Sequence, residues 1–343
     1  MTDKHLLRLD AFMSQANSLY YAKKDPFSDF TTAPEISQVF GELIAAWVIA
    51  VWQMMPSDSA VALVEMGPGR GTFMSDILRV IKKCCPSFYK NCNVFFIETS
   101  PRLRKIQQHN LMQNHSVQMD WFNSFSDIPS QPIILFANEF LDALPIRQFI
   151  KRSAGQWAER YVKQKQFVAK PVEDLPNSPV FKRAIQKGNI VEVSENSQNI
   201  IDEISRFLCA NFGAALFMDY GYCQPLWGDT LQAIYKGEKT FPLAFFGKAD
   251  LTSHVDFLTL GTIAVKAGAK LHPFLTQGDF LQRLGIMYRL EALSSHCSTE
   301  QKQSLLQDVR RLITPEEMGQ LFKVMAISHP SLHALPAFES IED

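Results

Sequence analysis

The chain has almost no net charge, because 34 lysine and arginine residues stand against 35 acidic residues. Without a basic surplus, we expect no nucleic-acid partner and no general attraction to anionic lipid. The longest apolar stretch, near residues 43–55, is too short for a membrane span, so we expect a buried helix there. The sequence also lacks internal repeats and low-complexity tracts.

The six cysteines form no C-x-x-C pair and have no histidine at zinc spacing. Scattered thiols suit a reducing compartment, and we expect neither disulfides nor a metal site. Residues 1–10 lack both a long apolar region and the arginine-rich, acid-free composition of an organelle presequence. Together these absences predict a cytoplasmic protein.

Hydrophobic residues make up 46% of the 343 residues, enough to bury a large core. Short apolar segments alternate with segments of helical period, a pattern typical of a doubly wound, mostly parallel sheet in an α/β fold. Strands are predicted at residues 61–66, 93–97, 118–122, 132–137, 214–218 and 322–327. Helices are predicted at residues 37–54, 72–83, 101–112, 198–210, 253–267, 278–284 and 300–312. Between residues 149 and 194, shorter polar pieces predict an inserted antiparallel patch.

The most informative segment places three glycines, Gly67, Gly69 and Gly71, directly after the first predicted strand. Glycines at this spacing let the backbone turn sharply, bring bare N–H groups to a ligand and start a helix. The pattern G-x-G-x-G differs from the dinucleotide motif G-x-G-x-x-G and from a P-loop. Glu65 would repel phosphate but attract a cationic ligand, which favours S-adenosylmethionine as the cofactor.

Polar residues follow three other predicted strands, where ligands of an open parallel sheet bind. Glu98 can accept hydrogen bonds from both hydroxyls of a ribose. Asn138, Glu139 and Asp142 follow the strand at 132–137, and Asp219 and Tyr220 follow the strand at 214–218. We therefore expect these strand ends to direct acids into one crevice.

Seven blocks of the sequence match a known family in the same order. They are residues 29–42, 65–72, 100–103 with Gln107, 138–148, 219–222, 228–233 and 250–257. On these blocks the chain resembles the MidA proteins, a group of class I methyltransferases that use S-adenosylmethionine and are regarded as protein arginine methyltransferases. Mitochondrial members of that family are complex I assembly factors. The segments Thr-Ala-Pro-Glu and Asn-Glu-x-x-Asp-Ala-Leu-Pro are more specific to it than the glycines.

The resemblance implies a Rossmann-like class I methyltransferase fold that carries an amino-terminal helical flap at residues 1–60. The core would comprise residues 61–149 and 213–343, interrupted by an insertion at residues 150–212. Thr32, Pro34 and Glu35 would lie in the flap over the cofactor, beside the cofactor-binding residues Glu65, Gly67, Gly69, Gly71, Glu98 and Asn138. The alternative for the flap is a proline-started helix whose first turn contains Glu35.

Methyl transfer to a guanidinium group needs carboxylates that fix the planar fork, and Glu139 and Asp142 are the candidates. Three residues apart at a predicted helix start, they could instead cap that helix. Asp219 and Tyr220 are candidates for substrate binding, although Tyr220 could equally be a packing residue. His254, on a helix that we expect to begin at Thr252, could relay the released proton or could be structural.

Three functions fit these features. The first is methylation of arginine in a partner protein, which the resemblance favours. The second is methylation of a small molecule or RNA, and the third is a non-catalytic assembly protein that keeps the cofactor fold. The segment from residue 271 onward could complete the sheet and could carry a homodimer surface.

Overall fold

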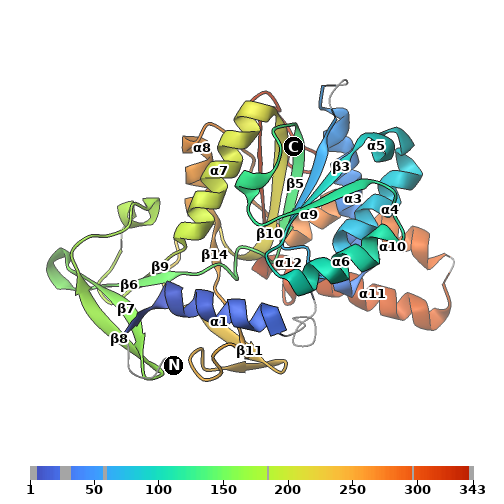
Figure 1. Ribbon diagram of the computed structural model, residues 1–343. Coiled ribbons are helices and arrows are strands. Elements are labelled where there is room, and N and C mark those ends of the chain that lie inside the picture. The colour runs from blue at the N-terminus through green and yellow to red at the C-terminus, as the bar shows by residue number, and fades with distance from the viewer. Residues whose placement is uncertain (1–5, 24–31, 57–59, 184, 296, 340–343) are drawn as a thin grey trace. The chain divides into compact units, whose positions relative to one another are not determined.

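The computed structural model describes residues 6–23, 32–56, 60–183, 185–295 and 297–339 (Figure 1). Two compact units divide the chain. The larger unit contains residues 31–139, 202–221 and 264–343, and the smaller unit contains residues 1–30, 140–201 and 222–263. Among the described residues, no helix is both long enough and apolar enough to cross a membrane.

A mostly parallel sheet forms the centre of the larger unit, in the order β15-β17-β10-β5-β2-β3-β4. Strands β4, β3, β2, β5 and β10 are parallel, and β17 runs antiparallel beside β10. The sequence order therefore reverses between β2 and β5, which is where open α/β sheets bind ligands. The bounds are β2 Ala62–Met66, β3 Asn93–Ile97, β4 Gln118–Phe122, β5 Ile133–Asn138, β10 Gly213–Tyr222, β15 Lys270–Leu271, β16 Leu275–Thr276 and β17 Phe322–Ser328.

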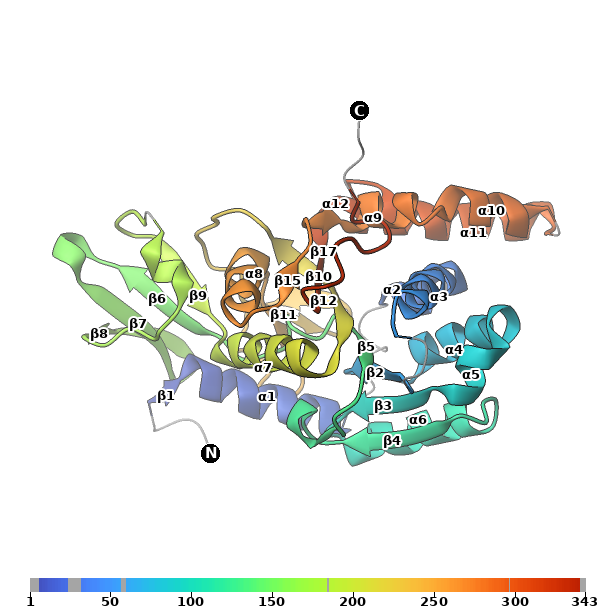
Figure 2. The same cartoon turned by 90° about the horizontal axis from the view of Figure 1, so that it is seen from above.

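Helices pack on this sheet and share its apolar core. Helices α3 and α4 lie against each other, and α6 lies close to β3 and β4 (Figure 2). Helix α3 buries Trp47 completely, which confirms the buried helix predicted near residues 43–55. The bounds are α2 Ala33–Ile36, α3 Gln38–Gln53, α4 Thr72–Cys84, α5 Pro86–Asn91, α6 Pro101–Met112, α7 Glu195–Asn211, α9 Gln277–Arg283, α10 Ile286–Ser294, α11 Thr299–Ile313 and α12 Met318–Leu321.

The smaller unit contains two antiparallel sheets. The first runs in the order β1-β7-β6-β9 with β8 beside β7, and the second in the order β12-β11-β13. The predicted antiparallel patch is therefore confirmed. The bounds are β1 Leu7–Arg8, α1 Leu9–Lys23, β6 Arg147–Lys151, β7 Trp157–Lys163, β8 Gln166–Val172, β9 Ile190–Val193, β11 Gln232–Tyr235, β12 Glu238–Thr240, β13 Asp250–Thr252, β14 Val255–Asp256 and α8 Phe257–Lys266.

Helix α1 ties the smaller unit together through one buried polar side chain. Asn17 Nδ2 donates to the carbonyl oxygens of Leu251 at 2.8 Å and Ala143 at 3.0 Å. Asn17 Oδ1 accepts from Leu251 N at 3.1 Å. These three bonds connect α1 to β13 and to the turn that follows residue 139, because a buried amide must satisfy both its donors and its acceptor.

Candidate functional site

Three glycines turn the chain between β2 and α4, as the sequence predicts. The φ angles of Gly67, Gly69 and Gly71 are +66°, +54° and +82°, in the left-handed region that favours glycine. A Cβ at Gly71 would in addition come within 3.0 Å of Leu111 Cδ1. The turn therefore requires glycine for its backbone conformation and, at Gly71, for space.

Two amide groups of this turn bond within the protein. Gly67 N donates to Ile97 O at 3.1 Å, and Gly71 N donates to Pro68 O at 2.7 Å. We expected the glycine N–H groups to face a ligand, and for these two that expectation is wrong. They close the turn and attach it to β3, so the conformation of the turn is set by protein hydrogen bonds.

Glu65 lies on β2, two residues before the turn, and its side chain is 3% exposed. Its Oε2 atom is buried and has no hydrogen-bond partner among the described residues. Burial raises the pKa of this carboxyl to about 8. A buried carboxyl with an unused oxygen is unfavourable unless a donor or a cation meets it. The position therefore suits a ligand that carries positive charge.

Asn138 ends β5, the strand next to β2, where Met66 pairs with Ala137. Because side chains alternate along a strand, Glu65 and Asn138 lie on the same face of the sheet. Asn138 Nδ2 donates to Glu139 Oε1 at 3.2 Å, whereas its Oδ1 is buried without a partner among the described residues. Two unused oxygens thus occupy the edge at which the strand order reverses.

Glu98 follows β3 and is connected to the glycine turn through Gln107. Glu98 Oε1 accepts from Ser100 N at 2.7 Å, and its Oε2 accepts from Gln107 Nε2 at 3.2 Å. The same Nε2 donates to Gly69 O at 2.8 Å, and Gln107 Oε1 accepts from Trp121 Nε1 at 2.8 Å. Burial is the main cause that raises the pKa of Glu98. The sequence assigned Gln107 no role, although this fully buried side chain joins the turn to Glu98.

The predicted flap residues Thr32, Pro34 and Glu35 lie at α2, a four-residue helix that begins at Ala33 and has Pro34 in its first turn. Glu35 Oε1 accepts from Thr72 Oγ1 at 2.6 Å, at the first residue of α4. Ala33 N donates to Glu139 Oε1 at 3.2 Å. Helix α2 therefore touches the elements that follow both β2 and β5, and contact with a cofactor stays a prediction.

Glu139 and Asp142 do not begin a helix, so that part of the prediction is wrong. Glu139 has a φ of +51°, and its N donates to Met218 O at 2.9 Å. Asp142 lies in a turn, is 5% exposed, and uses its carbonyl oxygen to accept from Ser253 N at 3.0 Å. A left-handed residue and turn geometry are incompatible with a helix start, so helix capping no longer explains these two acids.

Asp219 and Tyr220 lie within β10, because this strand continues to Tyr222, four residues beyond the end predicted at residue 218. Asp219 is 1% exposed, and its Oδ1 accepts from Tyr220 N at 2.9 Å. The ring of Tyr220 meets the ring of Phe322 edge to face, with centroids 5.6 Å apart. Tyr220 is therefore at least a packing residue, as the alternative held, and substrate binding by both residues stays a prediction.

His254 belongs to the smaller unit and lies between β13 and β14, not on a helix. Its N donates to Thr230 Oγ1 at 2.9 Å, and the preceding Ser253 N bonds to Asp142 O. These two bonds draw the amides out of helical geometry, so the helix expected from Thr252 begins instead at Phe257 as α8. Asp256 caps it, since Asp256 Oδ1 accepts from Thr259 N at 3.0 Å.

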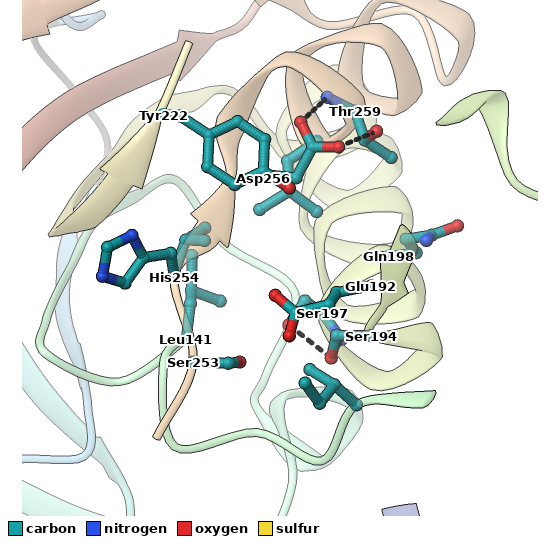
Figure 3. A pocket seen from close by; sticks show the side chains of 13 residues that line it. Leu141, Glu192, Ser194, Ser197, Gln198, Tyr222, Ser253, His254, Asp256 and Thr259 are labelled. Carbon is teal, nitrogen blue, oxygen red and sulfur yellow. Dashed lines mark hydrogen bonds between the residues drawn. The ribbon is translucent and has the colours of Figure 1, made fainter. Parts of the chain in front are cut away.

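A small pocket lies within the smaller unit (Figure 3). Its walls come from the turn after residue 140, from β9 and the start of α7, and from the segment between β13 and α8. The lining residues are Leu141, Ile146, Glu192, Ser194, Ser197, Gln198, Tyr222, Ser253, His254, Val255, Asp256, Thr259 and Leu260. The imidazole of His254 points away from the Glu192 carboxylate (Figure 3).

Glu192 was not selected from the sequence, although it is an acid between two valines of the predicted antiparallel patch. Its side chain is 9% exposed, and burial raises the pKa of the carboxyl to about 7. Gln148 Nε2 donates to Glu192 Oε1 at 2.7 Å, Thr230 N donates to the same oxygen at 3.0 Å, and Thr230 Oγ1 bonds to Oε2. An acid in an apolar alternation is the signal that could have identified it.

Comparison with known proteins identifies relatives over most of the chain. Residues 43–275 match the model of a family described as "Putative S-adenosyl-L-methionine-dependent methyltransferase". The mitochondrial protein arginine methyltransferase NDUFAF7 of Rattus norvegicus is 32% identical, over 92% of this chain and 78% of the rat protein. The protein of the same name in Homo sapiens is 33% identical, over 90% of this chain and 76% of the human protein.

Two solved structures from Burkholderia thailandensis share the fold. One, bound to S-adenosyl-homocysteine, has a TM-score of 0.80 and 25% identity, and the match covers 97% of this chain and 90% of that chain. The other, a native crystal structure, has a TM-score of 0.78 with the same identity and coverage. The expected fold class is therefore confirmed.

The comparisons correct one expectation. The relatives of rat and human carry mitochondrial names, which contradicts the prediction of a cytoplasmic protein. That prediction rested on the scattered thiols and on residues 1–10, and reduced thiols and the composition of ten residues do not distinguish these compartments. The location expected from composition is therefore wrong.

Proposed function

Because the chain belongs to this family of S-adenosylmethionine-dependent methyltransferases, we propose that it methylates arginine side chains of a partner protein. The observation that carries the choice of substrate is the similarity to protein arginine methyltransferases of 32–33% identity over at least 90% of the chain. Balanced charge, with 34 basic against 35 acidic residues, supports a protein substrate over RNA.

The residues at the reversal of the strand order suit the proposed cofactor. Glu65 offers a buried carboxyl oxygen that lacks a partner among the described residues, and the methionine end of the cofactor carries an ammonium group that would supply one. Asn138 Oδ1 offers a second acceptor on the same face of the sheet. Glu98 accepts from Ser100 N through Oε1 and from Gln107 Nε2 through Oε2, and a carboxylate has further acceptor capacity for the hydroxyls of a ribose.

The glycine turn and α2 complete the proposed cofactor site. Gly67, Gly69 and Gly71 would leave three positions of the turn without a side chain, so that adenosine could approach the backbone there. Thr32, Pro34 and Glu35 lie at α2, which bonds to Thr72 at the start of α4. We propose these residues for cofactor binding because α2 contacts the segments that follow β2 and β5.

When bound, S-adenosylmethionine supplies an electrophilic methyl group that a nitrogen lone pair accepts as the carbon–sulfur bond breaks. The protein must hold the guanidinium in line, exclude water and remove one proton from the nitrogen. Glu139 and Asp142 are proposed to orient the planar fork, because carboxylates bind it through paired hydrogen bonds. Asp219 and Tyr220 would line the substrate position, and His254 would accept the proton.

The test incubates the full chain with methyl-labelled S-adenosylmethionine and a lysate of its own cell. Label on an arginine of one or a few proteins, mapped by mass spectrometry, is the expected result. Glu139→Gln should lower the labelling rate at least about tenfold, because it removes the charge from a charge-assisted hydrogen bond. Glu173→Gln changes an exposed glutamate of the smaller unit in the same way and should leave the rate unchanged.

Three other outcomes would contradict the proposal. Label that enters only small molecules or RNA would assign a different substrate class. Cofactor binding without label in any product would favour an assembly protein that keeps the fold. Failure to bind S-adenosyl-homocysteine at all would contradict the proposed cofactor site itself.

A further inference from the structure

The pocket of the smaller unit contains no lysine or arginine among its lining residues, yet it contains two carboxylates. Asp256 is neutralised, because Arg183 Nη1 donates to its Oδ2 at 2.8 Å and Arg183 Nη2 donates to its Oδ1 at 3.3 Å. Both oxygens also accept from Thr259, so the hydrogen bonds of Asp256 are satisfied. Glu192 therefore remains as the carboxylate of this pocket that has no cation beside it within the described part of the chain.

The hydrogen bonds of Glu192 hold it in place without neutralising it. Its three donors come from Gln148 and Thr230, which are uncharged. Oε1 accepts two of these bonds and Oε2 accepts one, which leaves acceptor capacity on Oε2. Asp229, which also bonds to Gln148, is paired with Arg160 at 2.6 Å, and Arg160 also donates to Gln148 Oε1 at 2.7 Å, so the cation of this network contacts Asp229 and Gln148 and not Glu192. A buried carboxylate in such surroundings is complementary to a cation.

The neighbours of Glu192 provide polar groups that can accept hydrogen bonds from a planar cation. They do not form an anion-binding site. Tyr222 lies on the side of the pocket opposite Glu192, and Ser194 and Ser197 lie close to Glu192 (Figure 3). No described residue bonds to the Tyr222 hydroxyl, so this group is available to a ligand. The start of α7 would attract anions, but Ser194 already accepts from Ser197 N and Gln198 N.

The free volume of the pocket is about 30 Å³, which is room for about two water molecules. A nucleobase or an acyl chain is too large for this space, whereas the polar end of one side chain can enter it. Apolar side chains of Leu141, Ile146, Val255 and Leu260 complete the walls and suit the methylene stem of such a group.

We propose that the Glu192 pocket binds the guanidinium group of an arginine side chain of the protein substrate. The proposal rests on the proposed function and adds a binding site to it. Glu192 Oε2 would accept one N–H of the fork, while the hydroxyls of Tyr222 and Ser197 would meet donors that point in other directions. A lysine ammonium has only three donors at one point and would not span these groups.

The experiment follows Tyr222 directly in the full chain. Tyrosine is replaced with 3-fluorotyrosine, and the fluorine resonance of Tyr222 is identified among the eight tyrosines by its loss in Tyr222→Phe. Nα-acetyl-arginine methylamide is then titrated at constant ionic strength, with S-adenosyl-homocysteine present. The expected result is a saturable shift of the Tyr222 resonance that the uncharged citrulline analogue does not produce.

Glu192→Gln should weaken this binding at least about tenfold, because the substitution removes the negative charge and replaces the accepting Oε2 with an amide donor. The contact with Thr230 can persist with its direction reversed, since the new amide can donate to the second lone pair of Thr230 Oγ1, whose first lone pair accepts from His254 N. Glu173→Gln is the matched control and should bind like the parent. Unchanged resonances of the other tyrosines and unchanged binding of S-adenosyl-homocysteine would show that Glu192→Gln is folded.

Three results would overturn the proposal. They are a Tyr222 resonance that does not move, equal shifts with the arginine and citrulline probes, and unchanged affinity in Glu192→Gln. Each leaves the proposed function intact if labelled methyl groups still reach arginine of a protein. Loss of S-adenosyl-homocysteine binding by the parent chain would instead contradict the proposed function.

Discussion

Each of the two units contains a buried glutamate, and the two side chains differ in their hydrogen bonds. Glu65, at the edge of the parallel sheet, has an oxygen without a partner among the described residues. Glu192, in the antiparallel unit, has hydrogen bonds on both oxygens from uncharged groups. Burial raises both pKa values, to about 8 for Glu65 and about 7 for Glu192.

The difference shows that burial alone does not decide whether a carboxyl group has hydrogen-bond partners within the protein. Both side chains have lost water, but the protein replaces the lost hydrogen bonds only around Glu192. A ligand is therefore needed to complete the hydrogen bonds of Glu65, whereas protein groups hold Glu192 in position before any ligand binds. We expect substitutions near Glu65 to act mainly on cofactor affinity, and substitutions near Glu192 to act on the substrate.

The largest expected effect comes from Gly71→Val. Valine is strongly disfavoured at a φ of +82°, and its Cβ would meet Leu111 at 3.0 Å. Calorimetry should show S-adenosyl-homocysteine binding at least about 100-fold weaker, since a displaced turn loses several contacts together. Gly155→Val is the control, because Gly155 has a φ of +78° with nothing within 4 Å of its Cβ. Equal affinity loss in both variants would mean that general destabilisation, not the turn, is responsible.

Gln107→Ala should weaken cofactor binding about tenfold, because removing this amide leaves Gly69 O, Glu98 and Trp121 without their shared partner. Gln277→Ala removes another fully buried glutamine of the same unit, whose Nε2 donates to Leu312 O at 2.9 Å. Both variants should unfold at lower temperature, but only Gln107→Ala should bind S-adenosyl-homocysteine more weakly. Normal binding of S-adenosyl-homocysteine by Gln107→Ala would contradict the assignment of Glu98 to the cofactor site.

The stability of the cofactor-free protein should fall as the pH rises. Between the ordinary pKa of 4.5 and the raised values of about 8 and about 7, the folded carboxyls of Glu65 and Glu192 hold protons that the unfolded chain has released. The slope is at most about 1.4 kcal/mol per pH unit for each group. Both groups contribute to this fall, so Glu65→Gln and Glu192→Gln should each flatten the dependence of the melting temperature on pH above pH 5. An unchanged dependence in either variant would contradict a raised pKa for that carboxyl.

The smallest expected effect comes from Thr72→Val, which removes the hydrogen bond of 2.6 Å to Glu35 while keeping the shape of the side chain. If α2 covers the cofactor, the KM for S-adenosylmethionine should rise about threefold, as expected for loss of one hydrogen bond. Thr262→Val removes an exposed bond to Leu258 O on α8 and should leave KM unchanged. An unchanged KM in Thr72→Val would make α2 a structural helix cap.

The fold and the cofactor edge could be predicted because they depend on local patterns. The spacing of apolar residues and the glycine spacing at residues 67–71 identify β2, the turn and α4. The conformation of each of these elements depends on residues that are close to one another in the chain. The positions of Glu98 directly after β3 and of Glu139 directly after β5 could also be predicted, because both strands are apolar runs with clear ends. Those parts of the structure agree with the sequence prediction.

The substrate side could not be predicted because contacts distant in sequence decide it. The backbone of His254 bonds to Thr230, and that of Ser253 to Asp142, and these bonds replace the helix that periodicity suggests. Glu192 depends on Gln148 and Thr230, which lie 44 and 38 residues away. A single sequence contains no signal for such pairs, so the Glu192 pocket became visible only in three dimensions.

The most direct test of the central claim is the pH dependence of S-adenosyl-homocysteine affinity in the parent chain and in Glu65→Gln. If Glu65 meets the ammonium group of the ligand, it must ionise on binding, and its pKa before binding is about 8. Calorimetry of the parent should then show about tenfold tighter binding for each pH unit between 6 and 7, where the ammonium stays charged. Glu65→Gln should bind more weakly and show no such slope. The account would be contradicted if the affinity of the parent chain for S-adenosyl-homocysteine did not change with pH and Glu65→Gln bound this ligand equally well.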